Sequence, residues 1–286
     1  MKIKSFLVLL VLCIIGIGGI VGYANYYSPQ KVLLRSLDHF TRLKTVHASM
    51  DITTKLKDPK IPAPYQDSSI VAESDINLQN NTQKSHMTLK MSGMGIDFDM
   101  ILLKDGEMYM KMPFMGADWI QYDLKTLSKI SGVPLDLQSN DYVSQSLAFL
   151  KSMQPQTVVK VGSETIDGER TTRYTVQISR EKYLEHFNQL GVDSKITDQF
   201  RSADITLDLW INVLANTIVQ TQSDVKNLTL SNALTSVSEG TADSSIKTKY
   251  SKYNQPVTIG KPEGKIIPSE ELFKDAFPTS FPRTSQ

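Results

Sequence analysis

Methionine is concentrated in one part of this 286-residue chain, where its spacing could build a binding surface. Eight of the eleven methionines lie between Met87 and Met115, and six of them fall on the apolar side of predicted β-strands. Methionine is unbranched and polarisable, so it fills irregular space and adapts to varied guests. Strands in a rigid core favour branched residues such as valine and isoleucine instead. The residues alone leave two interpretations of this methionine-rich face open. It could be a deformable wall for a lipid or other apolar ligand, or it could belong to a filled core.

Groups that could perform catalysis are sparse. Asp97 with Asp99, and Asp204 with Asp208, share strand faces, but these faces are polar, so we expect solvated carboxylates rather than an acid–base pair in a cleft. The sequence has no Gly-x-Ser-x-Gly motif, and its single cysteine, Cys13, lies in an apolar run. Neither a nucleophilic triad nor an internal disulfide is therefore expected. Four scattered histidines give no metal-binding spacing, and we expect no enzyme, no metal and no cofactor.

The charge balance excludes another class of partner. The chain has 31 basic and 30 acidic residues and a net charge of +1. It therefore lacks the basic excess that is typical of nucleic-acid-binding proteins. Its length suits one large domain or two small ones. The mean hydropathy is slightly negative, which excludes a polytopic membrane protein.

An apolar block at the N-terminus predicts a membrane segment. Residues 6–23 carry no charge, and as a helix they would be about 27 Å long, close to the hydrocarbon thickness of a bilayer. Lysines precede this run but do not follow it closely, so the N-terminus is expected inside and the rest outside. The pattern favours an uncleaved anchor over residues 1–27. A signal peptide cleaved at Ala24 and lipidation of Cys13, which lacks the usual small residue before it, remain alternatives.

The remaining sequence predicts a strand-rich fold. Ser28 and Pro29 begin an amphipathic helix that ends near Lys44. Alternating apolar residues then predict an antiparallel meander with one apolar and one wet face. Helices are expected within 124–153, over 180–190 and, in the tail, over 270–276, among about ten strands in all. The predicted strands cover residues 46–56, 70–78, 87–91, 96–102, 108–112, 158–166, 171–178, 203–211, 218–226, 228–236 and 244–253.

Several short phrases of the sequence resemble a known family. They are DGEMYMKMP at 105–113, WIQYD at 119–123, VGSETIDG at 161–168 with TTRYTV at 171–176, DLWI at 208–211 and YSKYNQPV at 250–257. Together with the order of anchor, helix, meander, helical insert and later strands, they resemble the LppX/LprG-type branch of the LolA/LolB-like envelope lipoproteins. The resemblance covers about residues 30–262. The chain departs from the family in its weak lipidation motif around Cys13.

The resemblance implies an α+β fold, in which a large curved antiparallel sheet forms a half-barrel and helices cover its concave face. One N-terminal transmembrane helix (1–27) would precede this domain (28–262), and a proline-rich tail (263–286) would follow it. Members of this family are not enzymes, so no catalytic residue is carried over. The resemblance favours the ligand-wall interpretation of the methionines. The residues expected to line the cavity are Met87, Met91, Phe98, Met100, Met108, Met110, Met112, Ile205, Leu207 and Leu209.

The sequence therefore predicts a single-pass protein of the bacterial cell membrane with its C-terminal domain outside the cytoplasm. Its expected partners are a lipid or other hydrophobic ligand, the membrane itself and an envelope protein, with no nucleic acid. The alternative is a non-carrier scaffold or sensor of the envelope that has a filled core and binds a protein partner.

Overall fold

The computed structural model describes residues 28–58, 61–104, 106–113, 116, 118–123, 158–189, 192, 194–230, 240–269 and 271. The anchor expected over 1–27, with Cys13, and the helices expected within 124–153 lie outside these residues, as does nearly all of the helix expected over 270–276. Within the described ranges, no helix is long and apolar enough to cross a membrane.

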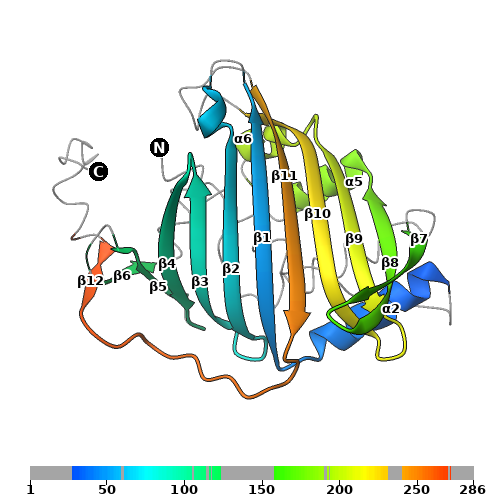
Figure 1. Ribbon diagram of the computed structural model, residues 1–286, viewed down its shortest axis with the longest axis horizontal. Coiled ribbons are helices and arrows are strands. Elements are labelled where there is room, and N and C mark those ends of the chain that lie inside the picture. The colour runs from blue at the N-terminus through cyan, green and yellow to red at the C-terminus, as the bar shows by residue number, and fades with distance from the viewer. Residues whose placement is uncertain are drawn as a thin grey trace, which may run out of the picture.

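A single sheet of twelve strands forms the body of the described protein (Figure 1). The strands lie in the order β12-β6-β5-β4-β3-β2-β1-β11-β10-β9-β8-β7. Neighbours pair antiparallel, except that β12 runs parallel to β6. The bounds are β1 (Thr45–Lys57), β2 (Asp67–Asn77), β3 (Thr82–Met91), β4 (Met94–Leu102), β5 (Glu107–Lys111), β6 (Trp119–Asp123), β7 (Val158–Ile166), β8 (Glu169–Ile178), β9 (Asp204–Asn212), β10 (Thr217–Leu230), β11 (Gly240–Ser251) and β12 (Ile266–Pro268).

This open antiparallel sheet with few helices agrees with the expected half-barrel. The structure adds two short strands at one side of the sheet, β6 and the edge strand β12, which the sequence pattern did not predict. It also joins the strands predicted over 218–226 and from 228 into one strand, β10, with a register shift between Val225 and Leu228. β12 begins at residue 266, within the segment that the sequence assigned to the tail.

The two halves of the sheet meet at one central seam. β1 pairs with β2 on one side and with β11 on the other, so the first and last long strands are neighbours (Figure 1). His47 of β1, for example, lies opposite Ser251 of β11. Strands β1–β6 and β7–β11 are otherwise joined to their sequence neighbours in two meanders.

Alternation along the strands divides the sheet into two faces. In β1, Val46, Ala48, Met50 and Ile52 are buried on the side that the helices cover, which we call the inner face. The intervening residues, such as His47, lie on the opposite, outer face. This period of two is what the backbone geometry of a strand requires, and it places the apolar side of both meanders on the inner face.

Helix α2 (Pro29–Thr41) begins as the sequence predicts and covers part of the inner face. The backbone N–H of Lys31 donates to Ser28 Oγ at 3.3 Å, which caps the helix. Val32, Leu33 and Leu37 are buried in a cluster with inner-face residues of β1, β8, β9 and β10. The helix therefore closes one end of the sheet, beside β7 and β10.

Two further helices pack on the inner face behind β9 and β10 (Figure 1). They are α5 (Arg180–Gln189), which the sequence predicted, and α6 (Ser194–Gln199), which it did not. The buried Tyr183 hydroxyl donates to the carbonyls of Phe200 and Ala203, the latter at 2.8 Å. These bonds fix α5 to the chain that leads from α6 into β9. A single 3₁₀ turn, η1 (Ala63–Tyr65), lies between β1 and β2.

Residues 252–265, which we call the C-terminal strap, run along one end of the sheet from β11 to β12 (Figure 1). The strap is bound at its start, where the backbone N–H of Asn254 donates to the carbonyl of Thr45 at 2.9 Å. Near its end, Lys261 Nζ lies 2.8 Å from Glu107 Oε2 of β5. This lysine, followed by the hydroxyl of Tyr109, holds the pKa of Glu107 below its usual value. The strap therefore connects the central strand β11 to the far edge of the sheet.

Candidate functional site

The methionines that the sequence singled out gather on the inner face of three neighbouring strands. Met87 of β3 lies opposite Phe98 of β4, and Met100 of β4 lies opposite Met110 of β5. Met108 of β5 lies opposite Leu102 of β4. All five side chains are buried, with 3–7% of their surface exposed, and belong to one apolar cluster. We call these five residues the Met wall. A row of cross-strand pairs of this kind is the basic packing unit of a sheet.

The other expected lining residues are more dispersed. Met112 and Ile205 are partly buried and pack against the cluster that contains the Met wall. Leu209 is fully buried, and Leu207 partly, in the second cluster, under α2. Met91 is partly buried at the end of β3. The structure thus brings seven of the ten expected residues into one cluster, while their contact with a ligand stays a prediction.

Several residues of the same cluster were absent from the expected lining. Met50 and Ile52 of β1 and Ile70 and Ala72 of β2 extend the Met wall to the centre of the sheet. Their alternation is visible in the sequence, but the expected lining came only from residues 87–112 and 205–209. Other members come from the helices and from the chain after them: Tyr183, Phe187, Ile196 and Phe200.

An aromatic group closes this cluster beneath α5 and α6. The ring centroids of Phe187 and Phe200 lie 5.0 Å apart at 72°, and those of Tyr183 and Phe187 lie 5.9 Å apart. Edge-to-face pairs at such distances add to the stability that burial provides. Because α6 contacts β10, this aromatic group lies over the half of the sheet across the seam from the Met wall.

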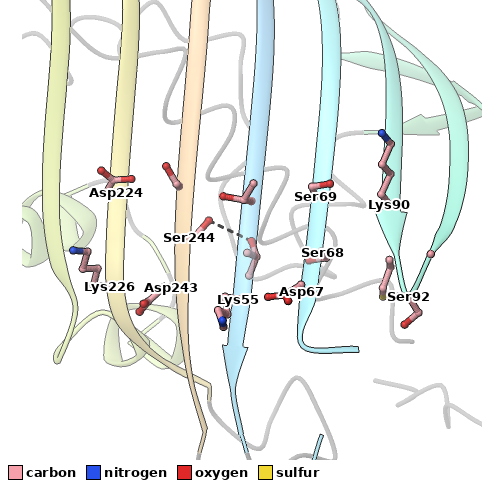
Figure 2. Close-up of a pocket in the computed structure, with 15 residues that line it drawn as sticks. Lys55, Asp67, Ser68, Ser69, Lys90, Ser92, Asp224, Lys226, Asp243 and Ser244 are labelled. Carbon is pink, nitrogen blue, oxygen red and sulfur yellow. Dashed lines mark hydrogen bonds between the residues drawn. The ribbon is translucent and has the colours of Figure 1, made fainter. Parts of the chain in front are cut away.

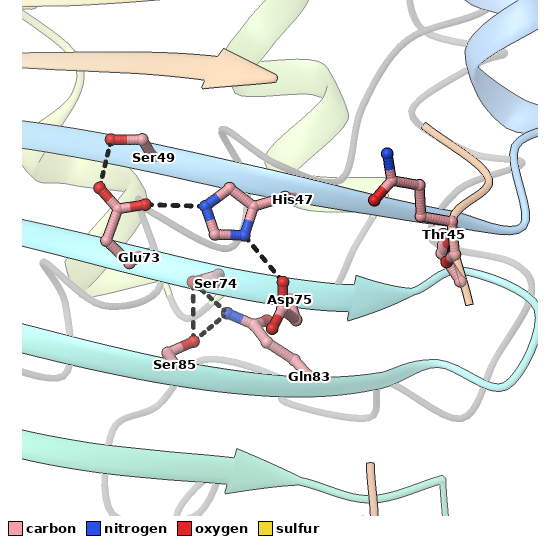
Figure 3. A network of polar contacts seen from close by, with 9 residues as sticks. Thr45, His47, Ser49, Glu73, Ser74, Asp75, Gln83 and Ser85 are labelled. Carbon is pink, nitrogen blue, oxygen red and sulfur yellow. Dashed lines mark hydrogen bonds and ion pairs between the residues drawn. The ribbon is translucent and has the colours of Figure 1, made fainter. Parts of the chain in front are cut away.

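Polar groups on the inner face are hydrogen-bonded to one another. Figure 3 shows Ser74 of β2 facing Ser85 of β3, with their hydroxyl oxygens 2.8 Å apart and the Gln83 amide donating to both. Both serines are almost fully buried. A buried hydroxyl without a partner would be costly, so this cluster satisfies polar atoms at the border of the apolar face.

The outer face carries a polar network over the same strands (Figure 3). His47 Nδ1 lies 2.7 Å from Asp75 Oδ1, and His47 Nε2 lies 2.9 Å from Glu73 Oε2. Ser49 donates to the second oxygen of Glu73 at 2.7 Å. These cross-strand contacts are partly exposed and stabilise the pairing of β1 with β2.

A polar hollow of about 540 Å³ lies at the end of the sheet away from α2 (Figure 2). Its lining comes from five strands and from the β3–β4 turn: Thr53, Thr54, Lys55, Asp67, Ser68, Ser69, Lys90, Met91, Ser92, Gly93, Asp224, Lys226, Asp243, Ser244 and Ser245. Lysines, aspartates and hydroxyls alternate across it, and Asp243 pairs with Lys57 at 2.7 Å. Its lining residues are mostly charged or hydroxyl-bearing, so they differ from the apolar residues that the sequence predicted for a cavity.

The paired aspartates are bonded to other kinds of groups. Asp97 accepts from Thr88 at 2.6 Å, and Asp99 lies 2.8 Å from His86 Nδ1. Asp204 forms an exposed ion pair with Arg180. These three contacts fit the solvated surface that we expected. Within the described ranges, no group of His, Cys, Asp and Glu could hold a metal ion.

Asp208 departs from that expectation because its side chain is only 4% exposed. Its carboxylate accepts from Arg173 Nη2 at 2.5 Å and from the hydroxyl of Thr175. The Arg173 guanidinium lies 5.1 Å above the ring of Trp210, whose indole N–H donates to Glu164. The β7–β8 hairpin curls over the outer face here (Figure 1), and this covering buries the ion pair.

No protein-family model and no curated protein matches the chain. Among solved structures, the lipoprotein LppX of Mycobacterium tuberculosis is 18% identical over 79% of this chain and 94% of its own, with a TM-score of 0.42. LprF of Mycobacterium bovis is 16% identical over 82% and 97%, with a TM-score of 0.46. A putative outer membrane lipoprotein-sorting protein domain of Vibrio parahaemolyticus is 9% identical over 75% and 87%, with a TM-score of 0.24.

The first of these structures, LppX, carries the name of the family that the sequence resembles.

Proposed function

We propose that this chain is a membrane-tethered, extracytoplasmic binding protein that holds or carries a lipid or another hydrophobic ligand against the Met wall. One observation carries the proposal. Flexible, polarisable side chains from three adjacent strands are gathered on one face, at positions where a rigid core would use branched residues. Apolar sites that accept varied acyl chains need such adaptable walls.

The position of the described helices supports this assignment. α2 contacts β7 and β10, and α6 contacts β10, so these helices pack on the β7–β10 half of the sheet. The Met wall lies on β3–β5, on the other side of the central seam. An acyl chain laid along the Met wall would gain about 0.8 kcal/mol for each CH₂ group that it buries, and no chemical step is required.

The tether and the location rest on the sequence. The uncharged run over 6–23, with lysines before it, favours a single-pass anchor and places the strand-rich part outside the cytoplasm of a bacterial cell. The same proposal holds that the protein is not an enzyme. An envelope protein that delivers or receives the ligand would be its natural partner.

Mass spectrometry of the full chain, purified from its native membrane, tests the proposal. We expect a lipid or another apolar molecule at close to one per chain. Met110→Asp, which puts a charge into the Met wall, should lose the ligand, whereas Lys84→Asp on the exposed outer face of β3 should keep it. Absence of any apolar ligand from the native chain would refute the carrier function.

Stability measurements separate a ligand wall from a filled core. If the Met wall is solidly packed, Met100→Ala should destabilise the ligand-free protein by about 2–5 kcal/mol, as for other core truncations. If it lines a ligand site, the loss without ligand should be much smaller, and ligand retention should fall instead. A full core penalty with no bound ligand would favour the envelope scaffold or sensor.

A further inference from the structure

One large apolar side chain projects fully into solvent at the end of the sheet beside α2. Leu214, in the turn between β9 and β10, is 98% exposed, whereas Met94, the next most exposed large apolar side chain in the part of the chain that the structure describes, is 60% exposed. The turn is ordered by its own polar groups. Asn212 Oδ1 accepts from the backbone N–H of Ala215 at 3.2 Å, and Asn216 adopts a positive φ of 52°. The leucine is therefore presented outward by a defined turn.

The position of this turn distinguishes Leu214 from an incidental surface leucine. Because β9 ends and β10 begins there, the turn lies at the same end of the sheet as the start of β1 and the β2–β3 turn. α2 contacts β10 and lies beside this turn (Figure 1). Met94 lies at the opposite end, beyond the β3–β4 turn.

The length of chain before α2 places this end near a bilayer. The apolar run ends at Tyr23, and only residues 24–27 separate it from the cap of α2. Four residues span at most about 14 Å. Tyr26 and Tyr27 are aromatic residues of the kind that concentrate at membrane interfaces. This step rests on the proposed tether, because it requires that residues 6–23 cross the membrane.

Charges at this end suit a lipid surface. Lys44 and Lys252 flank the strap where it leaves β11, and neither forms an ion pair with any described residue. Two acids at this end are already paired, since Asp38 lies 2.5 Å from Arg42 and Asp167 lies 2.9 Å from Lys249. A third, Glu169, accepts from the side-chain amide of Asn212 at 3.2 Å. Since no described acid pairs with them, these two ammonium groups can contact lipid phosphates.

We propose that the β9–β10 turn docks on the bilayer that holds the anchor, with Leu214 inserted at the boundary between head groups and acyl chains. Lys44 and Lys252 contact lipid phosphates beside it. The docked turn fixes the orientation of the sheet, so that α2 and the strap face the membrane and the β3–β4 turn faces away from it. The contact of the turn with the membrane interface would thus add to the binding that the anchor provides.

Site-specific fluorescence on the full chain tests the docking. Cys13 is the only cysteine, so Cys13→Ser allows a single environment-sensitive probe to be attached to Leu214→Cys or, as the matched control, to Met94→Cys. The chain is reconstituted into vesicles of phosphatidylcholine and phosphatidylglycerol in equal parts. Lipids with a quencher near the head group should reduce emission from position 214 by about half and leave position 94 unchanged.

The outcomes separate the docking from the tether. Chains that float with the vesicles while both probes remain in water would overturn the docking and leave the tether intact. Chains that do not float would overturn the tether, and the docking with it. With the probe at 214, Lys44→Gln with Lys252→Gln should weaken quenching in these anionic vesicles but not in pure phosphatidylcholine. If the double lysine variant is quenched as strongly as the chain with both lysines in the anionic vesicles, the two lysines do not take part in the contact.

Discussion

The ion pair between the partly exposed Arg173 and the buried Asp208 allows a quantitative test of how the β7–β8 hairpin is held. The two partners differ in exposure, since the side chain of Asp208 is 4% exposed and that of Arg173 is 38% exposed. We therefore expect an asymmetric response to mutation. Arg173→Met leaves a nearly buried carboxylate with Thr175 as its remaining partner. Asp208→Asn leaves a guanidinium that can still reach water.

The magnitudes follow from these exposures. Breaking a buried ion pair by removing one partner costs about 3–5 kcal/mol, and the partial exposure of Arg173 puts Arg173→Met near about 3 kcal/mol. Asp208→Asn keeps an acceptor for Thr175 and should cost about 1–2 kcal/mol. The double variant Arg173→Met with Asp208→Leu removes both charges and should return to within about 1 kcal/mol of the original protein.

Equilibrium urea unfolding of residues 28–286 measures these differences. Tryptophan emission is a suitable signal because Trp210 lies directly beneath Arg173. The matched control is Arg180→Met. Arg180 Nη2 lies 3.3 Å from Asp204 Oδ1, and the side chain of Asp204 is 66% exposed. An exposed pair of this kind should change stability by less than about 1 kcal/mol.

Two results would refute this reasoning. If Arg173→Met is no more destabilising than Arg180→Met, the hairpin does not bury the carboxylate of Asp208 in solution. If Asp208→Asn is the more damaging substitution, the guanidinium rather than the carboxylate is the group that depends on its partner.

Four further predictions concern the described part of the chain. Tyr183→Phe removes the bonds to the carbonyls of Phe200 and Ala203 and should lower the free energy of unfolding by about 1–2 kcal/mol, which urea unfolding measures; no change would show that these bonds do not hold α5. Burial raises the pKa of Tyr174, Tyr183 and Tyr250. The free energy of unfolding should therefore be at its full value below about pH 10 and fall as the pH rises further. Phenolate absorbance should appear together with unfolding, and ionisation of all tyrosines in the folded protein would contradict this. Burial lowers the pKa of His186, so the stability that its neutral form contributes above about pH 6.5 should be lost on acidification. His186→Gln should reduce the loss in the free energy of unfolding between about pH 7.5 and about pH 5.5. An unchanged pH dependence would exclude this histidine as a cause. Gly240→Ala would place a Cβ 3.0 Å from that of Asp58 and should cost about 1–3 kcal/mol, whereas Gly162→Ala, with nothing within 4 Å, should not show this steric loss.

The sequence predicts the long strands because each has one buried face. In β1, alternation from Val46 to Ile52 matches the burial along the strand, and the start of α2 follows from the Ser28 cap. The short elements cannot be predicted in this way. β12 has three residues and is a strand only because it meets β6, and the six residues of α6 are too few to display a helical period.

The faces on which the candidate side chains lie could be predicted from the sequence, whereas contacts between distant segments could not. The spacing of Met100 and Met110 assigns them correctly to one face. The same alternation places Asp208 on the outer face but cannot show that the hairpin later covers it, because that contact joins residues far apart in sequence. Likewise, the polar hollow arises from five strands brought side by side, and no local pattern marks it.

The central seam has a consequence for the order in which the sheet assembles. The β1 edge opposite β2 has no partner until β11 has been delivered, and the two are separated by roughly two hundred residues. Until then the first meander presents a long open strand edge, which is a template for wrong association. Closing so large a loop also makes the seam a slow, late step. Truncation before β11 should therefore yield aggregates rather than a smaller folded protein.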